Sequence, residues 1–125
     1  DSDVTPRLSL STPEELRLPL RWAAILRDHL YVSIAGSTGV HSGFDVAKLL
    51  LAGADVAMVT SSLLLHGAGH VATMQQQLRD WMEEHEYESV RQMLGAVRHS
   101  AVADPEAYER ANYIGNLVRY TSAFH

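Results

Sequence analysis

The sequence predicts an α/β fold, and three observations lead to that prediction. Two short segments, 31–35 and 56–59, carry the β-branched, aromatic and apolar residue types of strands, and a helical pattern of apolar residues lies between them at 43–52. The order strand, helix, strand is typical of a βαβ unit with parallel strands. With 125 residues, of which 46% are hydrophobic and 20% charged, the chain has the size of one domain with a core of its own.

The segment before the βαβ unit is expected to form a loop with a short strand in its first eleven residues, and then a helix. Thr12 and Glu15 have the spacing of a capping box, and Pro13 suits the first helical position. Proline lacks a backbone donor, so we expect one helical turn after Pro13 and the main helix from Pro19 to about Arg27.

Turn and capping residues mark the limits of the βαβ unit. The first strand stops at the turn 36–39, which has the sequence Gly-Ser-Thr-Gly. Ser42 as N-cap and Asp45 three residues later predict the start of the helix, and Gly53 predicts its end. The second strand, 56–59, is continuously apolar, a pattern typical of a strand covered on both faces.

Helices are predicted for the rest of the chain. Apolar residues at intervals of three and four predict a long amphipathic helix from Gly67 to about His85. A shorter helix is expected from Ser89 to Leu94, and the pair Asp104 and Pro105 predicts the cap of a last helix.

Charge and composition exclude several classes of function. Ten Lys and Arg against fifteen Asp and Glu give a net charge of -5, which disfavours a nucleic acid partner. The absence of cysteine excludes disulfides, thiolate metal sites and a cysteine nucleophile within this chain, and fits a cytoplasmic location. The apolar run 49–52 is far shorter than the ~20 residues that span a bilayer, so we expect no membrane partner.

The turns after the two predicted strands form the candidate binding site. Both are rich in glycine and hydroxyl residues, and parallel strands place their carboxyl ends side by side. Small residues there let backbone N–H groups approach an anion, as at the phosphate site of α/β barrels. The candidate residues are Gly36, Thr38, Gly39, Thr60 and Ser61. The alternative is that the glycines serve tight turns and the hydroxyls cap helices.

Three histidines carry weaker signals. His66 and His70 have the spacing of one helix face, which is compatible with a metal pair, but the residues between them offer no third ligand. We therefore expect capping or surface roles and no metal site. His41 lies close to the candidate turn and carries a charge when protonated, although an exposed position before Ser42 is the simpler expectation.

Five stretches of the chain resemble a known family. The stretches 8–22, 35–46 and 51–56 resemble the C-terminal part of the dihydroorotate dehydrogenase family, and 81–90 and 108–113 look like its dihydroorotate dehydrogenase-like branch. The combination of Gly-Val-His-Ser-Gly-Phe-Asp with Leu-Ala-Gly-Ala-Asp is the most specific part of this resemblance.

The resemblance implies the C-terminal portion of a TIM (β/α)8 barrel, and an incomplete one, because such barrels use about 250 residues. In this arrangement 1–31 is the loop and helix before strand 7, 32–66 is the phosphate-binding βαβ unit, and 67–125 forms the C-terminal helices. The chain begins with an aspartate and not with methionine, so we expect it to be a piece of a longer protein.

The same resemblance implies a cofactor and a reaction. Family members use FMN to oxidise a dihydropyrimidine, dihydroorotate to orotate in pyrimidine biosynthesis. The FMN phosphate would contact Thr38 and Gly39 in the first turn, where relatives commonly have Gly-Gly, and Thr60 and Ser61 in the second, where many have Gly-Thr. The family's catalytic base and flavin-facing lysines lie on earlier strands. We therefore expect no catalytic residue here and no activity from this piece alone.

Two alternatives remain beside this assignment. The first is a phosphate-binding barrel enzyme of another chemistry, a lyase or isomerase acting on a sugar phosphate, which would use the same turns without a flavin. The second is a catalytically inert, truncated module for binding or assembly, because two strands cannot close a barrel and their edges stay open for pairing. The expected partner is a small-molecule substrate, a dihydropyrimidine, and the chain is compatible with a homodimer.

Overall fold

The computed structural model describes residues 7–97. In chain order its elements are a 3-10 turn η1 (Pro13–Leu16), α1 (Arg17–His29), β1 (Ala35–Gly36), α2 (Gly43–Ala52), β2 (Val56–Ala57), α3 (Ser61–His66), α4 (His70–Glu84) and α5 (Val90–Met93). The last helix predicted from the sequence, with its cap at Asp104 and Pro105, lies outside the described residues. None of the helices between residues 7 and 97 is long and apolar enough to cross a membrane.

The two strands pair in parallel and are joined by α2, so the predicted βαβ unit is confirmed. Ala35 lies opposite Val56, and Gly36 lies opposite Ala57. The predicted start of the first strand at residue 31 is too early in the chain, because Tyr31 is fully exposed to solvent and is not paired with the second strand. Pairing begins at Ile34, whose carbonyl accepts the backbone N–H of Val56 at 3.3 Å.

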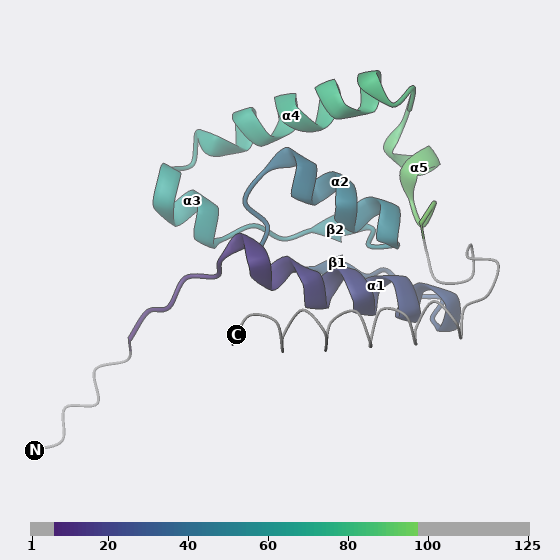
Figure 1. Ribbon diagram of the computed structural model, residues 1–125, viewed down its shortest axis with the longest axis horizontal. Coiled ribbons are helices and arrows are strands. Elements are labelled where there is room, and N and C mark those ends of the chain that lie inside the picture. The colour runs from purple at the N-terminus through teal and green to yellow at the C-terminus, as the bar shows by residue number, and fades with distance from the viewer. Residues whose placement is uncertain (1–6, 98–125) are drawn as a thin grey trace, which may run out of the picture.

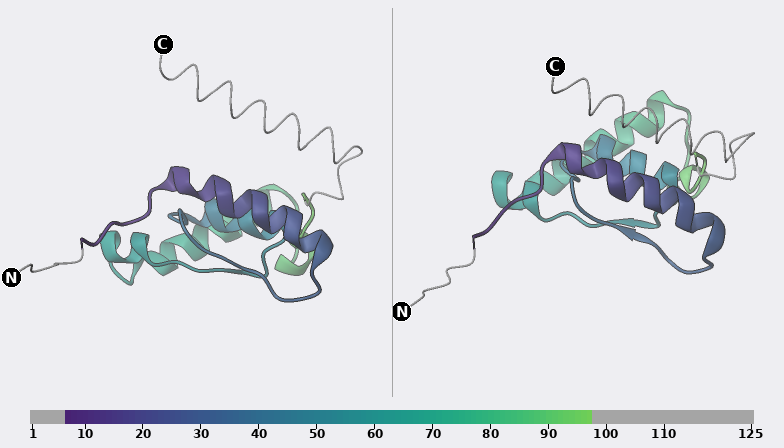
Figure 2. Two further views of the ribbon diagram at one scale, coloured as in Figure 1. Left: turned by 90° about the horizontal axis from the view of Figure 1, so that it is seen from below. Right: turned by 60° about the horizontal axis from the view of Figure 1, so that its bottom comes forward.

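Helices cover one face of the two strands. Figure 1 shows α2 lying between α1 and α4, and Figure 2 shows the strands along the edge of this helical layer. The expectation that the second strand is covered on both faces is wrong for the described residues, since Val56 and Met58 are each 54% exposed. Apolar side chains alternate between two faces of a strand, and here only one face has helices packed against it.

The first helix begins at Arg17, two residues before the predicted start at Pro19. Proline is tolerated there because the N–H groups of the first turn have no acceptor inside the helix. Before the helix, the backbone N–H of Thr12 donates to the Glu15 carboxylate at 2.6 Å, which is one half of the predicted capping box. The short strand expected before Thr12 does not form within residues 7–11.

The central helix α2 contributes to both core clusters. Leu49 is fully buried among side chains of α1, η1 and the sheet. Leu50 and Met93 belong to a second cluster, against which Trp81 packs. The predicted cap of α2 is confirmed, because Ser42 Oγ accepts the N–H of Asp45 at 3.2 Å. The position of this helix relative to the strands is therefore fixed both by its cap and by its buried side chains.

At the amino ends of the strands, one ion pair connects three segments. The Arg27 guanidinium pairs with Asp55 and donates through Nε to the Gly53 carbonyl at 2.7 Å. Asp55 also accepts the backbone N–H of Ile34 at 2.8 Å. This backbone hydrogen bond, with the nearby Arg27 charge, lowers the pKa of Asp55 from its ordinary value.

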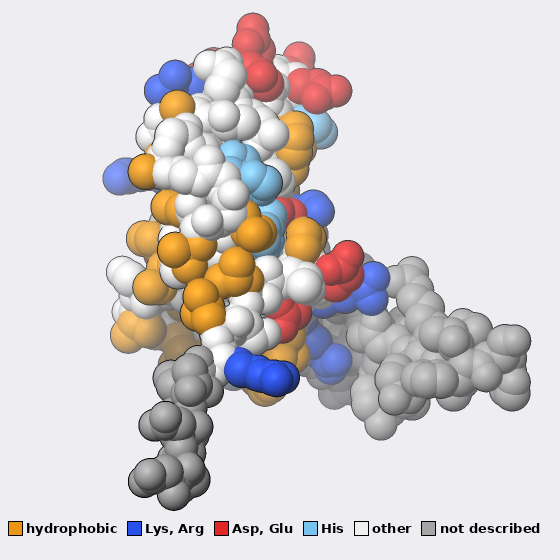
Figure 3. Space-filling model, turned by 90° about the vertical axis from the view of Figure 1, so that its left-hand side faces the viewer, with side chains coloured by type: hydrophobic (Ala, Val, Ile, Leu, Met, Phe, Trp, Pro, Cys, Tyr) orange, Lys and Arg blue, Asp and Glu red, His pale blue; other side chains and the backbone are white. Residues whose placement is uncertain are grey.

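The helices after the second strand differ in two respects from the prediction. The amphipathic helix begins at His70 instead of Gly67, and the short helix capped by Ser89 is confirmed. The additional helix α3 was missed because six residues are too few to show a period. Figure 3 shows hydrophobic side chains gathered on the side of the molecule where α3 lies, and α3 contributes Leu64 and Leu65, which are exposed.

Candidate functional site

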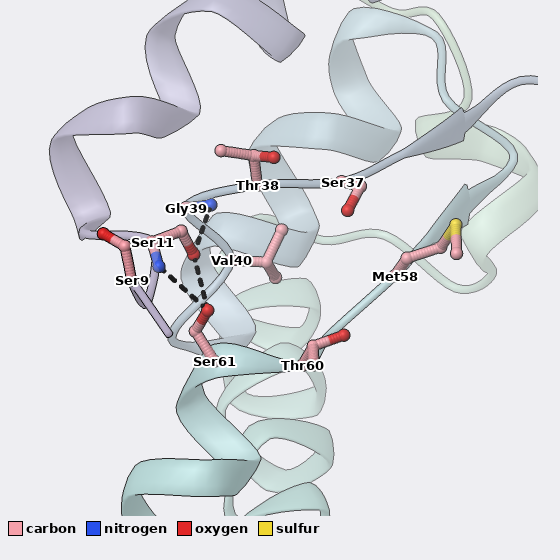
Figure 4. A pocket seen from close by; sticks show the side chains of 9 residues that line it. All are labelled: Ser9, Ser11, Ser37, Thr38, Gly39, Val40, Met58, Thr60 and Ser61. Carbon is pink, nitrogen blue, oxygen red and sulfur yellow. Dashed lines mark hydrogen bonds between the residues drawn. The ribbon is translucent and has the colours of Figure 1, made fainter. Parts of the chain in front are cut away.

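The two predicted turns meet in one hollow at the carboxyl ends of the strands. It has a volume of about 230 Å³ and is lined by Ser9, Ser11, Ser37, Thr38, Gly39, Val40, Met58, Thr60 and Ser61. Figure 4 shows these side chains, which come from both turns and from the segment before η1. We refer to this hollow as the hydroxyl pocket, because six of its nine lining residues are serine or threonine.

Four of the five candidate residues line the hydroxyl pocket, and Gly36 does not. Gly36 is buried behind the turn, where an added Cβ atom would lie 2.7 Å from Leu49 Cδ2. A Cβ atom on Gly39 would lie 2.3 Å from the backbone nitrogen of Leu16. Packing against α2 and η1 therefore accounts for the absence of a side chain at these two positions.

The first turn has an unusual backbone. Thr38 and Gly39 both have positive φ angles, 79° and 76°. Glycine adopts this left-handed region freely, whereas a β-branched residue does so at a cost of about 1–3 kcal/mol. Thr38 adds a hydroxyl to the hydroxyl pocket in a conformation that the surrounding chain must stabilise.

The segment before η1 supplies pocket residues that sequence reasoning missed. Ser11 is hydrogen-bonded to both turns: its backbone N–H donates to Ser61 Oγ at 3.0 Å, and its own Oγ lies 3.0 Å from Ser61 Oγ. The Gly39 N–H donates to Ser11 Oγ at 3.2 Å. These contacts join residues 28 and 50 positions apart in the chain, so no local pattern could have revealed them.

His41 is partly buried beside the hydroxyl pocket, which corrects the expectation of an exposed position. Its Nε2 lies 2.8 Å from the carbonyl oxygen of Ser11. His41 and Ser42 also donate their backbone N–H groups to the carboxylate of Asp45, at 3.0 and 3.1 Å. The imidazole therefore connects the start of α2 to the segment that carries Ser11.

His66 and His70 do not share a helix face, because α3 ends at His66 and α4 begins at His70. Their ring centroids are 4.8 Å apart, and His70 Nε2 lies 2.9 Å from the His41 carbonyl oxygen. Across residues 7–97 there is no group of three or more His, Asp or Glu side chains arranged to hold a metal ion. Within the described residues His70 contacts the His41 backbone and the His66 ring.

The hydroxyl pocket fits a phosphate group better than a whole cofactor. Pockets that enclose drug-sized ligands have about 300–1,000 Å³, and this one has about 230 Å³. The side chains of Ser9, Ser37, Thr38 and Thr60 make no hydrogen bond to another residue of the described part of the chain, so their hydroxyl groups are available to phosphate oxygens. No charged side chain is among the lining residues.

These observations define the class of protein. The fold is α/β with a parallel βαβ unit, and an anion-compatible pocket lies at the carboxyl ends of its two strands. Ligands of open and closed parallel sheets bind at this edge.

Comparisons with known proteins find two similar proteins. No protein-family model matches the chain. Over 63 residues the chain is 33% identical to a dihydropyrimidine dehydrogenase (NADP(+)), chloroplastic, of Arabidopsis thaliana, covering 50% of this chain and 15% of that protein. A crystal structure of DHODH in complex with ferulenol from Eimeria tenella matches with a TM-score of 0.64 and 19% identity, covering 69% of this chain and 23% of that chain. The resemblance to the dihydroorotate dehydrogenase family is thus confirmed, over a minor part of the length of these relatives.

The comparisons bear on two further expectations. Both relatives are dehydrogenases by name, which supports the assignment to an oxidoreductase family. The Arabidopsis relative is chloroplastic by name, so the cytoplasmic location expected from the sequence stays a prediction.

Proposed function

We propose that this chain is the C-terminal part of the barrel of an FMN-dependent, dihydroorotate dehydrogenase-like oxidoreductase, and that the hydroxyl pocket holds the FMN phosphate. The observation that carries this proposal is the meeting of the turns after the two strands in one hollow rich in hydroxyl groups. The names of both relatives support a dihydropyrimidine as the electron donor, with dihydroorotate as the specific candidate.

Side-chain hydroxyls do most of the binding in this proposal. The Gly39 N–H already donates to Ser11 Oγ, so it is not a free backbone donor for the phosphate. Ser37, Thr38 and Thr60 are exposed to solvent within the hydroxyl pocket, and each can donate one hydrogen bond to a phosphate oxygen. Bound FMN supplies the acceptor for a hydride equivalent, and these residues hold the cofactor at its phosphate end.

No lining residue can act as a general base near neutral pH, because serine, threonine, glycine, valine and methionine do not titrate there. The acidic residues 83, 84, 86 and 88 are exposed and lie at and beyond the end of α4. The described residues therefore bind and position, and the 125-residue chain alone is expected not to oxidise dihydroorotate. Measurable turnover by this chain would contradict that expectation.

The test compares FMN with riboflavin, which differs only in lacking the phosphate. A carboxylate is placed in the hydroxyl pocket by Ser37→Asp, and the matched control is Ser33→Asp, at an exposed serine outside it. Two unit charges about 4 Å apart repel by about 1 kcal/mol in water and about 4 kcal/mol at an effective dielectric constant of 20. We expect Ser37→Asp to weaken FMN binding by at least about fivefold and to leave riboflavin binding unchanged.

The measurement is a titration of flavin fluorescence with the complete protein, including any sequence that its gene encodes around this chain. Ser33→Asp should match the wild type for both flavins. If Ser37→Asp and Ser33→Asp weakened FMN binding equally, the phosphate would lie outside the hydroxyl pocket. A wild-type protein that binds inorganic phosphate but neither flavin would favour the alternative of a phosphate-binding barrel enzyme without a flavin.

A further inference from the structure

Ser11 connects the two turns through its backbone N–H and its Oγ (Figure 4), and its carbonyl oxygen contacts His41. Its backbone N–H and its Oγ both contact Ser61 Oγ, at 3.0 Å each. Its Oγ accepts the Gly39 N–H, and its carbonyl oxygen contacts His41 Nε2. We call these four hydrogen bonds the Ser11 network.

The Ser11 network leaves one hydrogen for a ligand. Ser11 and Ser61 carry two hydroxyl hydrogens between them, and the bond between their oxygens uses one. The backbone hydrogens of Ser11 and Gly39 occupy one acceptor position on each hydroxyl oxygen. Whichever serine donates in the shared bond, the other retains a hydroxyl hydrogen, and both side chains line the hydroxyl pocket. An anion can accept this hydrogen.

Two histidines hold the Ser11 network in place. A carbonyl oxygen only accepts hydrogen bonds, so His41 must carry a hydrogen on Nε2 to donate to Ser11. For the same reason His70 donates through Nε2 to the carbonyl oxygen of His41. Because His70 is the first residue of α4, the contacts run from α4 through the start of α2 to the segment before η1.

We propose that Ser11, held by His41, is a positioning residue for the phosphate site. It sets the distance between the first turn, at Gly39, and the second turn, at Ser61, and it directs one hydroxyl hydrogen of the serine pair to the bound anion. This inference rests on the proposed function, because it assigns how the hydroxyl pocket is built for the phosphate of FMN.

The test is Ser11→Ala, which removes Oγ and keeps the backbone contacts to Ser61 and His41. Losing a hydrogen bond and leaving a partner unsatisfied corresponds to about a 5- to 50-fold weaker affinity. We expect a loss of this size for FMN and for inorganic phosphate, and no change for riboflavin. Ser11→Thr keeps the hydroxyl and should restore most of the preference for FMN. Ser33→Ala, outside the hydroxyl pocket, should match the wild type.

The role of His41 is tested by the ratio of the affinity for FMN to the affinity for riboflavin. His41→Leu removes the donor to the Ser11 carbonyl and should lower the ratio. His41→Gln retains an amide donor, so it should lower this affinity ratio less than His41→Leu does. The control is His29→Leu, at an exposed histidine in the last turn of α1, which should leave the ratio unchanged.

The outcomes separate this inference from the proposed function. If the wild type prefers FMN and Ser11→Ala keeps the same preference, the positioning role is overturned and the proposed function stands. Equal losses of FMN and riboflavin with a lower unfolding temperature would show a purely structural role and would also overturn it. If the wild type has no preference for FMN, the proposed function fails. In that case the binding of inorganic phosphate tests the positioning role by itself. Weaker phosphate binding by Ser11→Ala than by the wild type supports the role, and a wild type that binds no phosphate overturns it.

Discussion

The contact between α2 and α4 depends on the missing side chain of Gly43. A Cβ atom at this position would lie 2.2 Å from the Met74 carbonyl oxygen, 2.7 Å from Gln77 Cβ and 2.7 Å from the Leu78 nitrogen. Two of these three atoms belong to the backbone of α4, which cannot move without shifting the helix. The Gly43 N–H also donates to Gln77 Oε1 at 2.8 Å. Gly43→Ala should therefore separate the two helices locally.

Two opposing effects set the magnitude of this change. Alanine is favoured over glycine in a helix by up to about 1 kcal/mol. Overpacking a core contact costs about 1–3 kcal/mol, and a lost hydrogen bond about 0.5–1.5 kcal/mol more. The clash outweighs the propensity, and we expect a net loss of about 1–3 kcal/mol in the free energy of unfolding. For a chain of this length that corresponds to a decrease of about 4–12 °C in the unfolding temperature.

Gly69→Ala provides the matched control. Gly69 has φ -60° and precedes α4, and an added Cβ atom would meet nothing within 4 Å. Thermal and urea unfolding of both variants should show Gly69→Ala at or slightly above wild-type stability and Gly43→Ala clearly below it. If Gly43→Ala matched the wild type in both measurements, the close packing of α2 on α4 would be refuted.

Two further predictions concern stability. Ser62 is fully buried and its Oγ has no partner among the described residues, so Ser62→Ala should leave the free energy of unfolding unchanged or raise it by about 1 kcal/mol; a loss above that in urea unfolding would reveal a hidden partner. The pKa of Asp55 is lowered in the folded chain, so its contribution to stability is fully present above the ordinary aspartate value of about 3.9 and is lost as pH falls through the lowered pKa. Asp55→Asn, which weakens the partly exposed pair with Arg27, should cost about 1 kcal/mol at pH 7 and progressively less below pH 4, and a deficit that is constant across this range would contradict the assignment.

Local signals predicted the elements whose limits are set by nearby residues. The cap of α2 needs only Ser42 and Asp45, three positions apart, and both the capping contact and the helix are confirmed. The short helix predicted over 89–94 is also confirmed, and in the structure the Ser89 side chain caps it by accepting the N–H of Gln92. Because the two partners of such a capping hydrogen bond lie three residues apart, the local sequence is enough to predict it.

Burial by distant segments was harder to predict. The apolar residues at the start of the first predicted strand indicated pairing, yet Tyr31 and Val32 lie outside the sheet and are exposed. Similarly, His66 and His70 have helical spacing but belong to different helices, because Gly67 between them has a φ of 84°. Periodicity shows which residues are apolar or evenly spaced. It does not show which distant segment of the chain packs against them.

Within the hydroxyl pocket, too, some residues could be predicted from the local sequence and others could not. The turn residues Thr38 and Thr60 could be predicted because they follow predicted strands, and parallel strands end at one edge. Ser11 could not, because its contacts are with Gly39 and Ser61 far along the chain. Only the folded position of η1, whose backbone at Leu16 leaves no room for a side chain on Gly39, brings that segment to the turns.

The stretches that carry the family resemblance have structural roles in this chain. Asp45 caps α2 and is largely buried. Gly53, with a φ of 127°, leaves space for Arg27, whose Cβ would lie 2.7 Å from an added Cβ atom. Asp55 binds the backbone of the first strand at Ile34. These residues hold the βαβ unit together, and none of them lines the hydroxyl pocket. Asp45, Gly53 and Asp55 thus form a first set of residues, which stabilises the fold, whereas the proposed binding of FMN depends on a second set, the hydroxyl residues of the pocket, several of which lie in the same stretches. Substitutions in the first set should change the free energy of unfolding and leave the preference for FMN over riboflavin intact in the molecules that remain folded. Substitutions in the second set should lower that preference.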